Sequence, residues 1–339
     1  MTPSRGSTDA TGPVIALTGA TGFLGSHIAD VLLARGYQVR ASVRATSSLR
    51  WLEGKAIATV QADLTDPAAC RAFLDGTAGL IHCAGVVSAP SEELYQVGNV
   101  SSTGCLLEAA ADAWTGADRR PTFVLISSLA AHGPADLEHP ARETDPCRPI
   151  TAYGRSKLAA EALLTEGDWP YRTVTLRPPA LYGPRDREFL PLVKMATRGW
   201  TGILGRKMSG LSLVDGRDAA AAAVRLLESP STSGPYFVDD GRRGYDWPAL
   251  AAALGTMAGR RIRTLRVPLG LLKFASLLAG PGRAARSPIL NPDRIRDLEV
   301  PGWVCDGNRL VKDTGFAPRF DAATGLADVL AFYRKENWL

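Results

Sequence analysis

The chain has 339 residues, of which 45% are hydrophobic and 22% are charged, a composition typical of a globular protein with a substantial core. Its five cysteines are scattered, odd in number and without a C-x-x-C pair. This usage suggests neither a disulfide framework nor a zinc cluster, so we expect free thiols and no metal site.

The net charge of +5 is unevenly distributed along the chain. Residues 1–186 carry 16 basic and 19 acidic groups, whereas residues 187–339 carry 23 basic and 15 acidic groups, a balance of +8. A nucleic-acid-binding protein would show a dense basic run or interleaved aromatic residues, and neither is present. The later basic excess is consistent with a bound anionic small molecule or with a solvated, arginine-rich surface.

The first residues, MTPSRGSTDATG, are polar and small. They predict a disordered tail over residues 1–12 rather than a cleavable signal, and no apolar run reaches the roughly 18 residues that cross a membrane. We therefore expect a cytoplasmic protein without a membrane span.

Apolar runs rich in β-branched residues predict strands, and helix-length segments separate them. The predicted strands are Val14–Thr18, Gln38–Val43, Ala56–Gln61, Ala78–Cys83, Thr122–Ser127 and Arg172–Arg177. The intervening helices include Phe23–Ala34, Glu92–Trp114 and Thr151–Glu166. Because parallel neighbours need long right-handed crossovers, this alternation predicts an α/β fold with a doubly wound parallel sheet of the Rossmann type.

After Tyr182 the pattern loosens into shorter segments punctuated by proline and glycine. The pattern predicts a helix near Ala219–Glu228, short strands near Tyr236 and Ile262, and a last helix near Leu326–Glu336. We therefore expect a Rossmann domain over residues 13–184 and a smaller substrate-binding lobe over residues 185–339, with one or more segments returning to the sheet. The lobe is expected over the C-terminal edge of the sheet, where open α/β sheets bind ligands.

Three glycines follow the first predicted strand at three-residue spacing, in the stretch LTGATGFLG. Gly19, Gly22 and Gly25 permit a tight turn and let backbone N–H groups approach a pyrophosphate at the positive end of the next helix. A glycine triplet alone is weak evidence. Its place between a strand and an amphipathic helix is typical of a dinucleotide site.

The end of the second predicted strand, VRASVRATSS, indicates which dinucleotide binds. An NAD site places Asp or Glu there for the ribose 2′-OH, and that carboxylate would repel a 2′-phosphate. Here Arg44 stands at the tip, with Ser42, Thr46 and Ser47 nearby and no acid until Glu53. A charge-assisted hydrogen bond is worth about 1.5–3 kcal/mol, or roughly 10- to 150-fold in affinity. We therefore expect NADP(H) rather than NAD; a solvated surface arginine is the simpler alternative.

Two further stretches are expected beside the cofactor. VQADLTDP places Asp63 and Leu64 just after the third strand, where adenine would lie. HCAG ends the fourth strand on Cys83, Ala84 and Gly85, which are small enough to let the chain pass close to the cofactor. Neither stretch is specific alone, and their order and spacing carry the prediction.

The candidate catalytic residues lie in VLISSLAAHGP and TAYGRSKLAAEAL. Tyr153 and Lys157 are four residues apart and therefore share one face of a predicted helix. A free tyrosine has a pKa of about 10, and moving it to about 7 requires roughly 4 kcal/mol of stabilisation of the phenolate, which Lys157 can supply. Such a pair occurs by chance on many helices. The dinucleotide pattern before it and the serines Ser127 and Ser128 favour a catalytic role.

Taken together, the motifs resemble an extended short-chain dehydrogenase/reductase of the NAD-dependent epimerase/dehydratase-like superfamily. The matching stretches are TGATGFLG, ADL, HCAG, SS, YGRSK and RPPALYGP, in family order across Val14–Pro184, with a weaker likeness continuing to the C-terminus. VRASVR further resembles the dihydroflavonol 4-reductases, and SSLAAHGP resembles the 3β-hydroxysteroid dehydrogenase branch.

This resemblance implies roles for individual residues. Ser128 would polarise the substrate carbonyl, Tyr153 would transfer the proton and Lys157 would bind the nicotinamide ribose, with Ser127 as the alternative serine. The implied cofactor-binding positions are Gly19, Thr21, Gly22, Phe23, Leu24, Gly25, Arg44, Asp63, Leu64, Cys83, Ala84, Gly85, Tyr153, Lys157, Pro178 and Ala180. The expected reaction is NADPH-dependent reduction of a ketone, or the reverse oxidation of a secondary alcohol, with Tyr153 as the acid or base.

Departures from the family pattern narrow the reaction and leave two alternatives. Dehydratases of this group carry an Asp-Glu pair after the catalytic hydroxyl, where this chain has Leu129, Ala130 and Ala131. Epimerases carry an Arg-Asp-aromatic run where this chain has SGLSLVDGRDAA. A nucleotide-sugar epimerase with bound NAD remains the second candidate, because several basic residues could meet a diphosphate: Arg206, Lys207, Arg242 and Arg243. The third candidate is a cofactor-binding regulator without turnover. Such relatives typically lose the tyrosine or the lysine, and this chain keeps both.

The substrate is expected to be largely hydrophobic. The stretch VPLGLLKFASLLAGPG, Val267–Gly282, is too short to span a bilayer and predicts an apolar helix over the substrate cleft, with attachment to a membrane surface as the alternative. The basic excess after residue 186 adds the expectation of an anionic or thioester-linked group at one end of the substrate. We expect the protein to bind a small-molecule substrate and no nucleic acid. We also consider that it forms a homodimer.

Overall fold

The computed structural model describes residues 12–116, 120–204, 210–279 and 292–339, and its largest element is a seven-stranded parallel sheet. The strand order is β11-β6-β5-β4-β1-β2-β3. These strands are β1 (Val14–Thr18), β2 (Gln38–Val43), β3 (Ile57–Gln61), β4 (Gly79–His82), β5 (Thr122–Ile126), β6 (Arg172–Arg177) and β11 (Gly234–Phe237). This is the order of a doubly wound sheet, so the predicted fold class is confirmed. The predicted tail lies outside the described residues, apart from Gly12.

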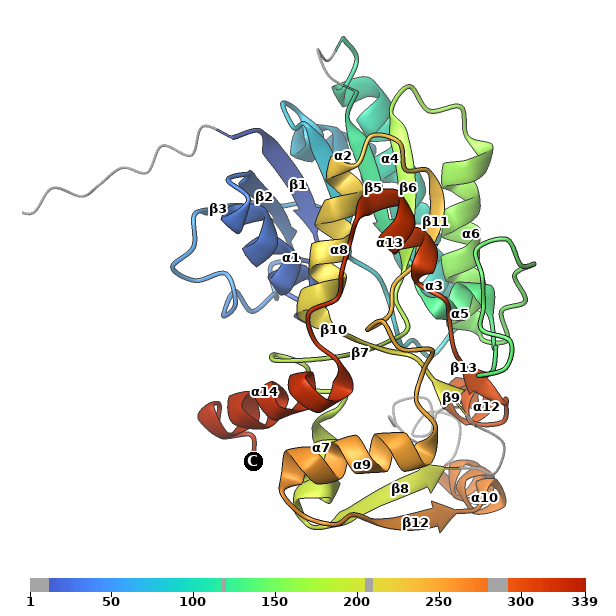
Figure 1. Ribbon diagram of the computed structural model, residues 1–339. Helices are drawn as coiled ribbons and strands as arrows, with labels where there is room; N and C mark the ends of the chain where they lie inside the picture. The colour runs from blue at the N-terminus through green and yellow to red at the C-terminus, as the bar shows by residue number, and fades with distance from the viewer. Residues whose placement is uncertain (1–11, 117–119, 205–209, 280–291) are drawn as a thin grey trace, which may run out of the picture.

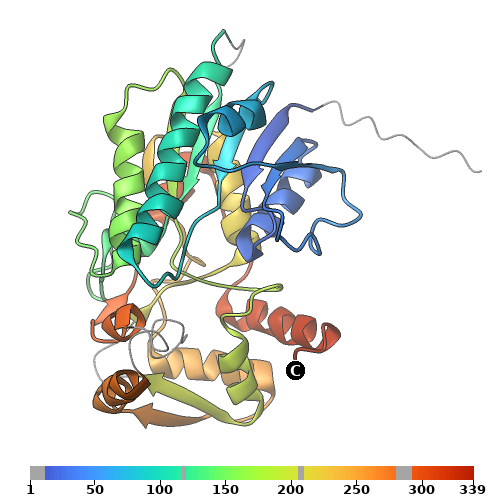
Figure 2. The same ribbon diagram turned by 180° about the vertical axis from the view of Figure 1, so that it is seen from behind.

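Helices cover both faces of this sheet (Figures 1 and 2). Ile15 and Leu17 of β1 point into one core with α1 and α8, whereas Ala16 points into the other with α2, α4 and α6. Because both faces are buried, strands such as β5 are apolar throughout. The first layer holds α1 (Phe23–Ala34), α8 (Gly216–Glu228) and α13 (Asn308–Thr314); the second holds α2 (Pro67–Leu74), α4 (Ser102–Ala113) and α6 (Ala152–Glu166). Shorter elements near the carboxyl edge are α3 (Glu92–Tyr95), the π-helical turn η1 (Gln96–Ser101) and α5 (Leu129–His132).

A smaller lobe lies below the carboxyl ends of the sheet strands in Figures 1 and 2. Its strands form the parallel pairs β10-β7, β12-β8 and β13-β9, and helices α7, α9 and α14 enclose its core of Val193, Leu254 and Leu326. The strands are β7 (Ala180–Tyr182), β8 (Trp200–Leu204), β9 (Gly210–Leu211), β10 (Leu213–Asp215), β12 (Arg263–Val267) and β13 (Gly302–Trp303). The helices are α7 (Leu190–Thr197), α9 (Trp247–Ala258), α10 (Leu269–Ala279), α12 (Pro292–Asp297) and α14 (Ala322–Lys335).

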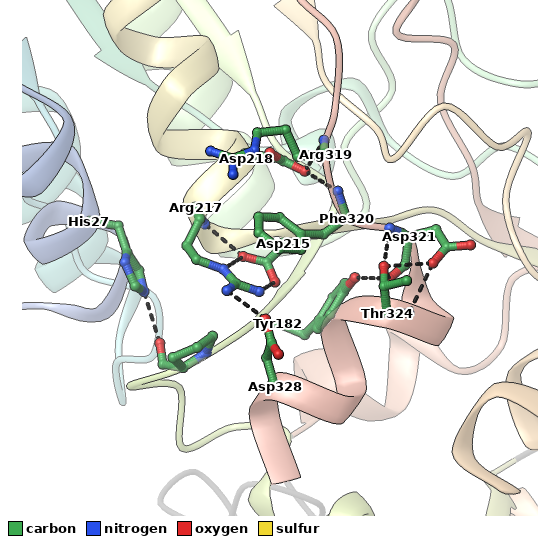
Figure 3. A network of polar contacts seen from close by, with 11 residues as sticks. His27, Tyr182, Asp215, Arg217, Asp218, Arg319, Phe320, Asp321, Thr324 and Asp328 are labelled. Atoms are coloured by element: carbon green, nitrogen blue, oxygen red, sulfur yellow. Dashed lines mark hydrogen bonds and ion pairs between the residues drawn. The ribbon is translucent and has the colours of Figure 1, made fainter. Parts of the chain in front are cut away.

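A network of polar contacts joins the lobe to α8 (Figure 3). Asp215 is fully buried and binds the Arg217 guanidinium at 2.8 and 2.9 Å. Arg217 also binds Asp328 of α14 at 2.8 Å, and its guanidinium lies 3.6 Å from the centre of the Phe320 ring. Asp218 accepts two backbone N–H groups of the segment before α14, at 2.8 and 2.9 Å. These contacts fix α14 relative to the sheet.

The turn after β7 is anchored to α1. The Nε2 of His27 donates to the Pro184 carbonyl at 2.8 Å (Figure 3), and burial lowers the pKa of His27 to about 4. Arg185 adopts a φ of +75° and reaches back to Ser26 Oγ at 3.1 Å and to Asp30 at 2.7 Å. The crossover from the sheet to the lobe is therefore held in place by side chains of α1.

The strands and helices predicted before Tyr182 are all present, with ends that shift by one residue at most. The predicted helix Glu92–Trp114 differs, because it contains the π-helical turn η1. The helix predicted near Ala219 begins earlier, at Gly216, since Asp215 caps its first turn. In the described part of the chain, no helix combines the length and apolar character that crossing a bilayer demands.

Candidate active site

The carboxyl ends of β1 and β4 are joined through one hydroxyl group. Thr18 Oγ1 accepts the N–H groups of Cys83 and Ala84 at 3.1 and 3.0 Å. With both acceptor positions used, the hydroxyl donates to Nδ1 of His82 at 2.7 Å. Burial, together with the nearby Lys157, lowers the pKa of His82 to about 3, so this acceptor is neutral. The HCAG segment therefore leaves β4 directly beside the glycine turn.

The turn between β1 and α1 is shaped for close contact with an anion. Gly19 has a φ of +71°, and a Cβ there would lie 2.7 Å from the Ala84 nitrogen, so only glycine fits. The cap residue before helix α1 is Gly22, which has no side chain to bind the first N–H groups, whereas α2, α6, α8, α9 and α14 are each preceded by an Asp or Thr cap. The first N–H groups of α1, at residues 23–25, thus suit a ligand pyrophosphate. The turn fits the dinucleotide that the motif predicts.

The two serines after β5 have different surroundings. Ser127 is buried, and its hydroxyl donates to Glu161, which forms a buried ion pair with Arg177. Ser128 is half-buried and caps α5, its Oγ accepting the Ala130 N–H at 3.1 Å. An oxygen that accepts in this way keeps its own proton for donation to a ligand. The hydroxyl of Ser127 is therefore used within the fold, and that of Ser128 is the better placed for substrate.

Tyr153 lies in the first turn of α6, where this helix meets α5. A Cβ on Gly154 would lie 2.3 Å from the carbonyl oxygen of Ala130, so the missing side chain permits the contact. The ring of Tyr153 is half-buried and its centre lies 6.2 Å from that of Tyr95. Ser128 is the cap residue of α5. The close contact between Gly154 and Ala130 therefore brings the segment of Ser128 beside the segment of Tyr153.

Lys157 lies one turn further along α6 and is buried. Its Nζ donates to the carbonyl oxygen of Ile126, the last residue of β5, at 2.6 Å. Burial lowers the pKa of Lys157 to about 8, against the opposing effects of Cys83 and Glu161. A buried ammonium with a perturbed pKa at the edge of the sheet is a candidate functional group.

Asn99 is a site residue that the sequence analysis missed. It is buried on η1, accepts the Val86 N–H at 2.7 Å, and donates to the Val86 carbonyl at 3.0 Å and to Ser156 Oγ at 2.9 Å. A Cβ on Gly85 would lie 2.9 Å from Oδ1 of Asn99 and 3.7 Å from Nζ of Lys157. Asn99 therefore fixes the segment after HCAG against α6, beside the lysine. Such π-helical turns are rare and are frequently found at functional sites.

Arg44 begins the loop after β2 and is exposed. Its N–H donates to Ser47 Oγ at 3.1 Å, which tightens the start of the loop. Further along, Arg50 forms an ion pair with Glu336 at the end of α14. The loop that presents Arg44 is thus held at its other side by the C-terminal helix.

The remaining predicted cofactor positions border the same edge of the sheet. Asp63 is exposed, and the N–H and hydroxyl groups two residues later donate to it at 2.9 and 2.7 Å and lower its pKa. Leu64 packs against the core between the sheet, α2 and α4. The Pro178 carbonyl accepts the Leu129 N–H at 2.8 Å, and Ala180 opens β7.

The basic residues considered for a diphosphate are only partly described. Arg206 and Lys207 lie outside the described residues. Arg242 is exposed, pairs with Asp321 at 3.2 Å and lies 5.5 Å from the centre of the Tyr245 ring. Its guanidinium is therefore already engaged within the lobe.

Comparison with known proteins places these features in a family. Residues 15–238 match the model described as the NAD dependent epimerase/dehydratase family. A ceramide reductase of Caulobacter vibrioides is 29% identical over 335 residues, which cover 98% of each chain. A putative dihydroflavonol 4-reductase of Synechocystis is 28% identical over 340 residues, 95% of each chain.

A solved structure has a similar fold. The UDP-glucose 4-epimerase of Thermotoga maritima superimposes with a TM-score of 0.76 at 20% identity, over 96% of this chain and 99% of that one. The resemblance inferred from the motifs is confirmed by the family model and the named reductases. The chain belongs to the NAD-dependent epimerase/dehydratase family, whose members bind a nicotinamide cofactor, and is an NAD(P)-dependent oxidoreductase of the extended short-chain dehydrogenase/reductase type.

Proposed function

We propose that the protein is an NADPH-dependent reductase that interconverts a ketone and a secondary alcohol in a largely hydrophobic substrate. The observation that carries the proposal is the contact of α5 with α6 at the carboxyl edge of the sheet, where the segments of Ser128, Tyr153 and buried Lys157 meet. The named reductases among the relatives support the same class of reaction. The nicotinamide, when bound, supplies or accepts the hydride.

The proton is assigned to the hydroxyl of Tyr153. In reduction, Oη donates to the carbonyl oxygen as negative charge develops there, and Ser128 Oγ donates a hydrogen bond to the same oxygen. The ammonium of Lys157 stabilises the phenolate that remains on Tyr153. In the reverse direction, this phenolate removes the proton of the alcohol.

The substrate class rests on the relatives and on the composition of the lobe. The relative matched over 98% of each chain is named a ceramide reductase, and ceramide is a lipid. We expect a panel of long-chain ketones, β-keto acids, sterols, flavonoids and UDP-sugars to show loss of reduced-nicotinamide absorbance with apolar ketones. Interconversion of UDP-sugars without added cofactor, and no response to any ketone, would support the epimerase alternative instead.

The preference for NADPH is assigned to Arg44, which is exposed at the end of β2 where an NAD site has a carboxylate. We expect NADPH to bind at least about tenfold more tightly than NADH, and Arg44→Asp to reduce or invert that ratio. Fluorescence titration with both cofactors measures it. Arg334→Asp, which makes the same charge change on an exposed residue of α14, should leave the ratio unchanged. Equal affinities of the parent protein for NADPH and NADH would show that Arg44 does not bind the 2′-phosphate.

The choice between the two serines is tested by a pair of alanine variants. Ser128→Ala should lower kcat by about 10²- to 10³-fold, because one hydrogen bond to the developing oxyanion is lost. Ser127→Ala should leave kcat nearly unchanged and cost about 1–3 kcal/mol of stability, because Glu161 loses a buried donor. Steady-state kinetics and thermal unfolding of both variants separate the two effects. A larger loss of kcat in Ser127→Ala would exchange the roles.

A further inference from the structure

Helix α10 is apolar apart from Lys273 and Ser276, yet among the described residues its large apolar side chains are only partly covered. Leu272 is buried, whereas Leu271, Phe274, Leu277 and Leu278 are 59%, 58%, 78% and 71% exposed. Their spacing of three, three and one residues places the four exposed side chains on one face of the helix. A helix face made of large apolar side chains is normally buried. The expected apolar helix has formed, but it lies on the side of the lobe away from the Rossmann sheet rather than over a cleft at the sheet's carboxyl edge, and four of its large side chains are exposed.

Exposed apolar side chains also lie on two strands of the same lobe. Figures 1 and 2 show β12 along the outer edge of the lobe, with α10 following it, on the side away from the Rossmann sheet. Leu265 of β12 and Trp200 of β8 are also exposed. We name these two residues and the four on α10 the docking surface. Large exposed apolar side chains gathered on one lobe in this way suit an interaction site.

Basic side chains border the docking surface. Arg263 pairs with Trp200 in the β12–β8 ladder, and its guanidinium lies 5.6 Å from the centre of the tryptophan ring. Arg260 and Arg261 precede this strand and are exposed, and a Cβ on Gly199, next to Trp200, would lie 3.6 Å from the Arg260 side chain. Residues 259–279 contain five basic residues and no acidic one. Because Lys273 is paired with Glu299, the cationic border of the docking surface consists of the exposed Arg260, Arg261 and Arg263.

We propose that the docking surface binds the protein peripherally to an anionic lipid bilayer, with α10 lying in the plane of the interface. Leucine and aromatic side chains flanked by arginine and lysine are typical of helices that lie in the bilayer interface. Arginines near the headgroups add attraction to anionic lipids. A second copy of this chain is a poorer occupant, because a two-fold contact would bring the same cationic borders together.

Docking would bring the substrate lobe to a surface where hydrophobic molecules reside. This consequence rests on the proposed function, whereas the binding itself does not. Membrane binding is therefore measured without substrate, and its failure would leave the reductase proposal standing.

Sedimentation with vesicles tests the inference on the full chain. We expect the protein to sediment with vesicles of phosphatidylcholine and phosphatidylglycerol, less with phosphatidylcholine alone, and less as salt increases. Leu277→Glu/Leu278→Glu should lower the partition coefficient at least about tenfold. Arg260→Gln/Arg261→Gln should lower it about fivefold per charge, on the anionic vesicles only.

The matched control is Val311→Glu/Leu339→Glu, which adds the same charge at exposed apolar residues outside the docking surface. It should sediment like the parent protein, and all variants should keep the parent melting temperature, NADPH affinity and mass in light scattering. The inference is overturned if the parent stays in the supernatant or the control loses as much binding. It is equally overturned if Leu277→Glu/Leu278→Glu melts earlier or halves in mass, since the face would then pack within the chain or against a second copy.

Discussion

Tyr153→Phe is expected to lower kcat by about 10²- to 10⁴-fold and to leave the Kd for NADPH within about twofold of the parent value. The phenyl ring beside Tyr95 is kept, and only the hydroxyl that transfers the proton is removed. The loss should be equal in kcat and kcat/KM, because the interaction is made in the transition state. Steady-state consumption of NADPH and fluorescence titration measure the two quantities.

Tyr95→Phe is the matched control, since it removes a hydroxyl from the adjacent ring. That hydroxyl accepts the Ala89 N–H at 3.0 Å, so its loss should affect the local loop and change kcat little. A folded Tyr153→Phe protein with parent turnover would show that another group transfers the proton. A comparable loss in Tyr95→Phe would show that the effect is not specific to Tyr153.

Lys157→Met should lower kcat/KM by up to about 10³-fold and weaken NADPH binding as well. A free phenol has a pKa of about 10, so without the ammonium the phenolate is disfavoured by about three units at pH 7. Loss of a charge-assisted hydrogen bond to the ribose lowers cofactor affinity by a further roughly 10-fold or more. The same titration and kinetic assays measure both effects, and an unchanged cofactor affinity would contradict the second role.

The pH dependence of stability separates the function of Lys157 from its place in the fold. Burial lowers its pKa to about 8, from 10.5 in an unfolded chain, so the cofactor-free native state binds fewer protons than the unfolded state between these values. The free energy of unfolding therefore rises by about 3 kcal/mol between pH 8 and pH 10.5. Below pH 8 the cost of burying the charged ammonium is fully present. Lys157→Met removes this rise and should be at least as stable as the parent at pH 7. Denaturant unfolding at several pH values compares the two, and a strongly destabilised variant would make Lys157 a structural residue.

The sheet and its first turn could be predicted from the sequence because their causes are local. Strands buried on both faces are apolar throughout, and Gly19 is required by a positive φ and by the close approach of Ala84. Tyr153 and Lys157 could be paired because helical spacing alone places them on one face. These predictions needed no knowledge of contacts between distant segments.

Other features depend on contacts that no local pattern encodes. Asn99 lies on the π-helical turn η1 and contacts Val86 and Ser156, which belong to separate segments of the chain. Arg177 and Glu161 form a buried ion pair between different elements, and Glu161 also accepts the hydroxyl of Ser127.

Helix α9 was missed although its sequence carried a signal. Asp246 caps the helix and Gly259 ends it in the left-handed conformation, the start and stop residues expected of a helix. Proline stands at the second helical position, where it is tolerated because a first-turn N–H group has no partner within the helix. For α10, the apolar composition indicated a helix but could not show which side would stay exposed.

Transfer of label from NADPH deuterated at C4 to an apolar ketone tests the central claim most directly. We expect one of the two C4-labelled forms to give an alcohol with one deuterium on the carbinol carbon, and one NADP⁺ to form per alcohol. Mass spectrometry of the product and nicotinamide absorbance measure both in one reaction, with Tyr153→Phe as the slow control. The account is contradicted if no ketone gains deuterium while the denatured protein releases bound NAD and the native protein interconverts UDP-sugars without added cofactor.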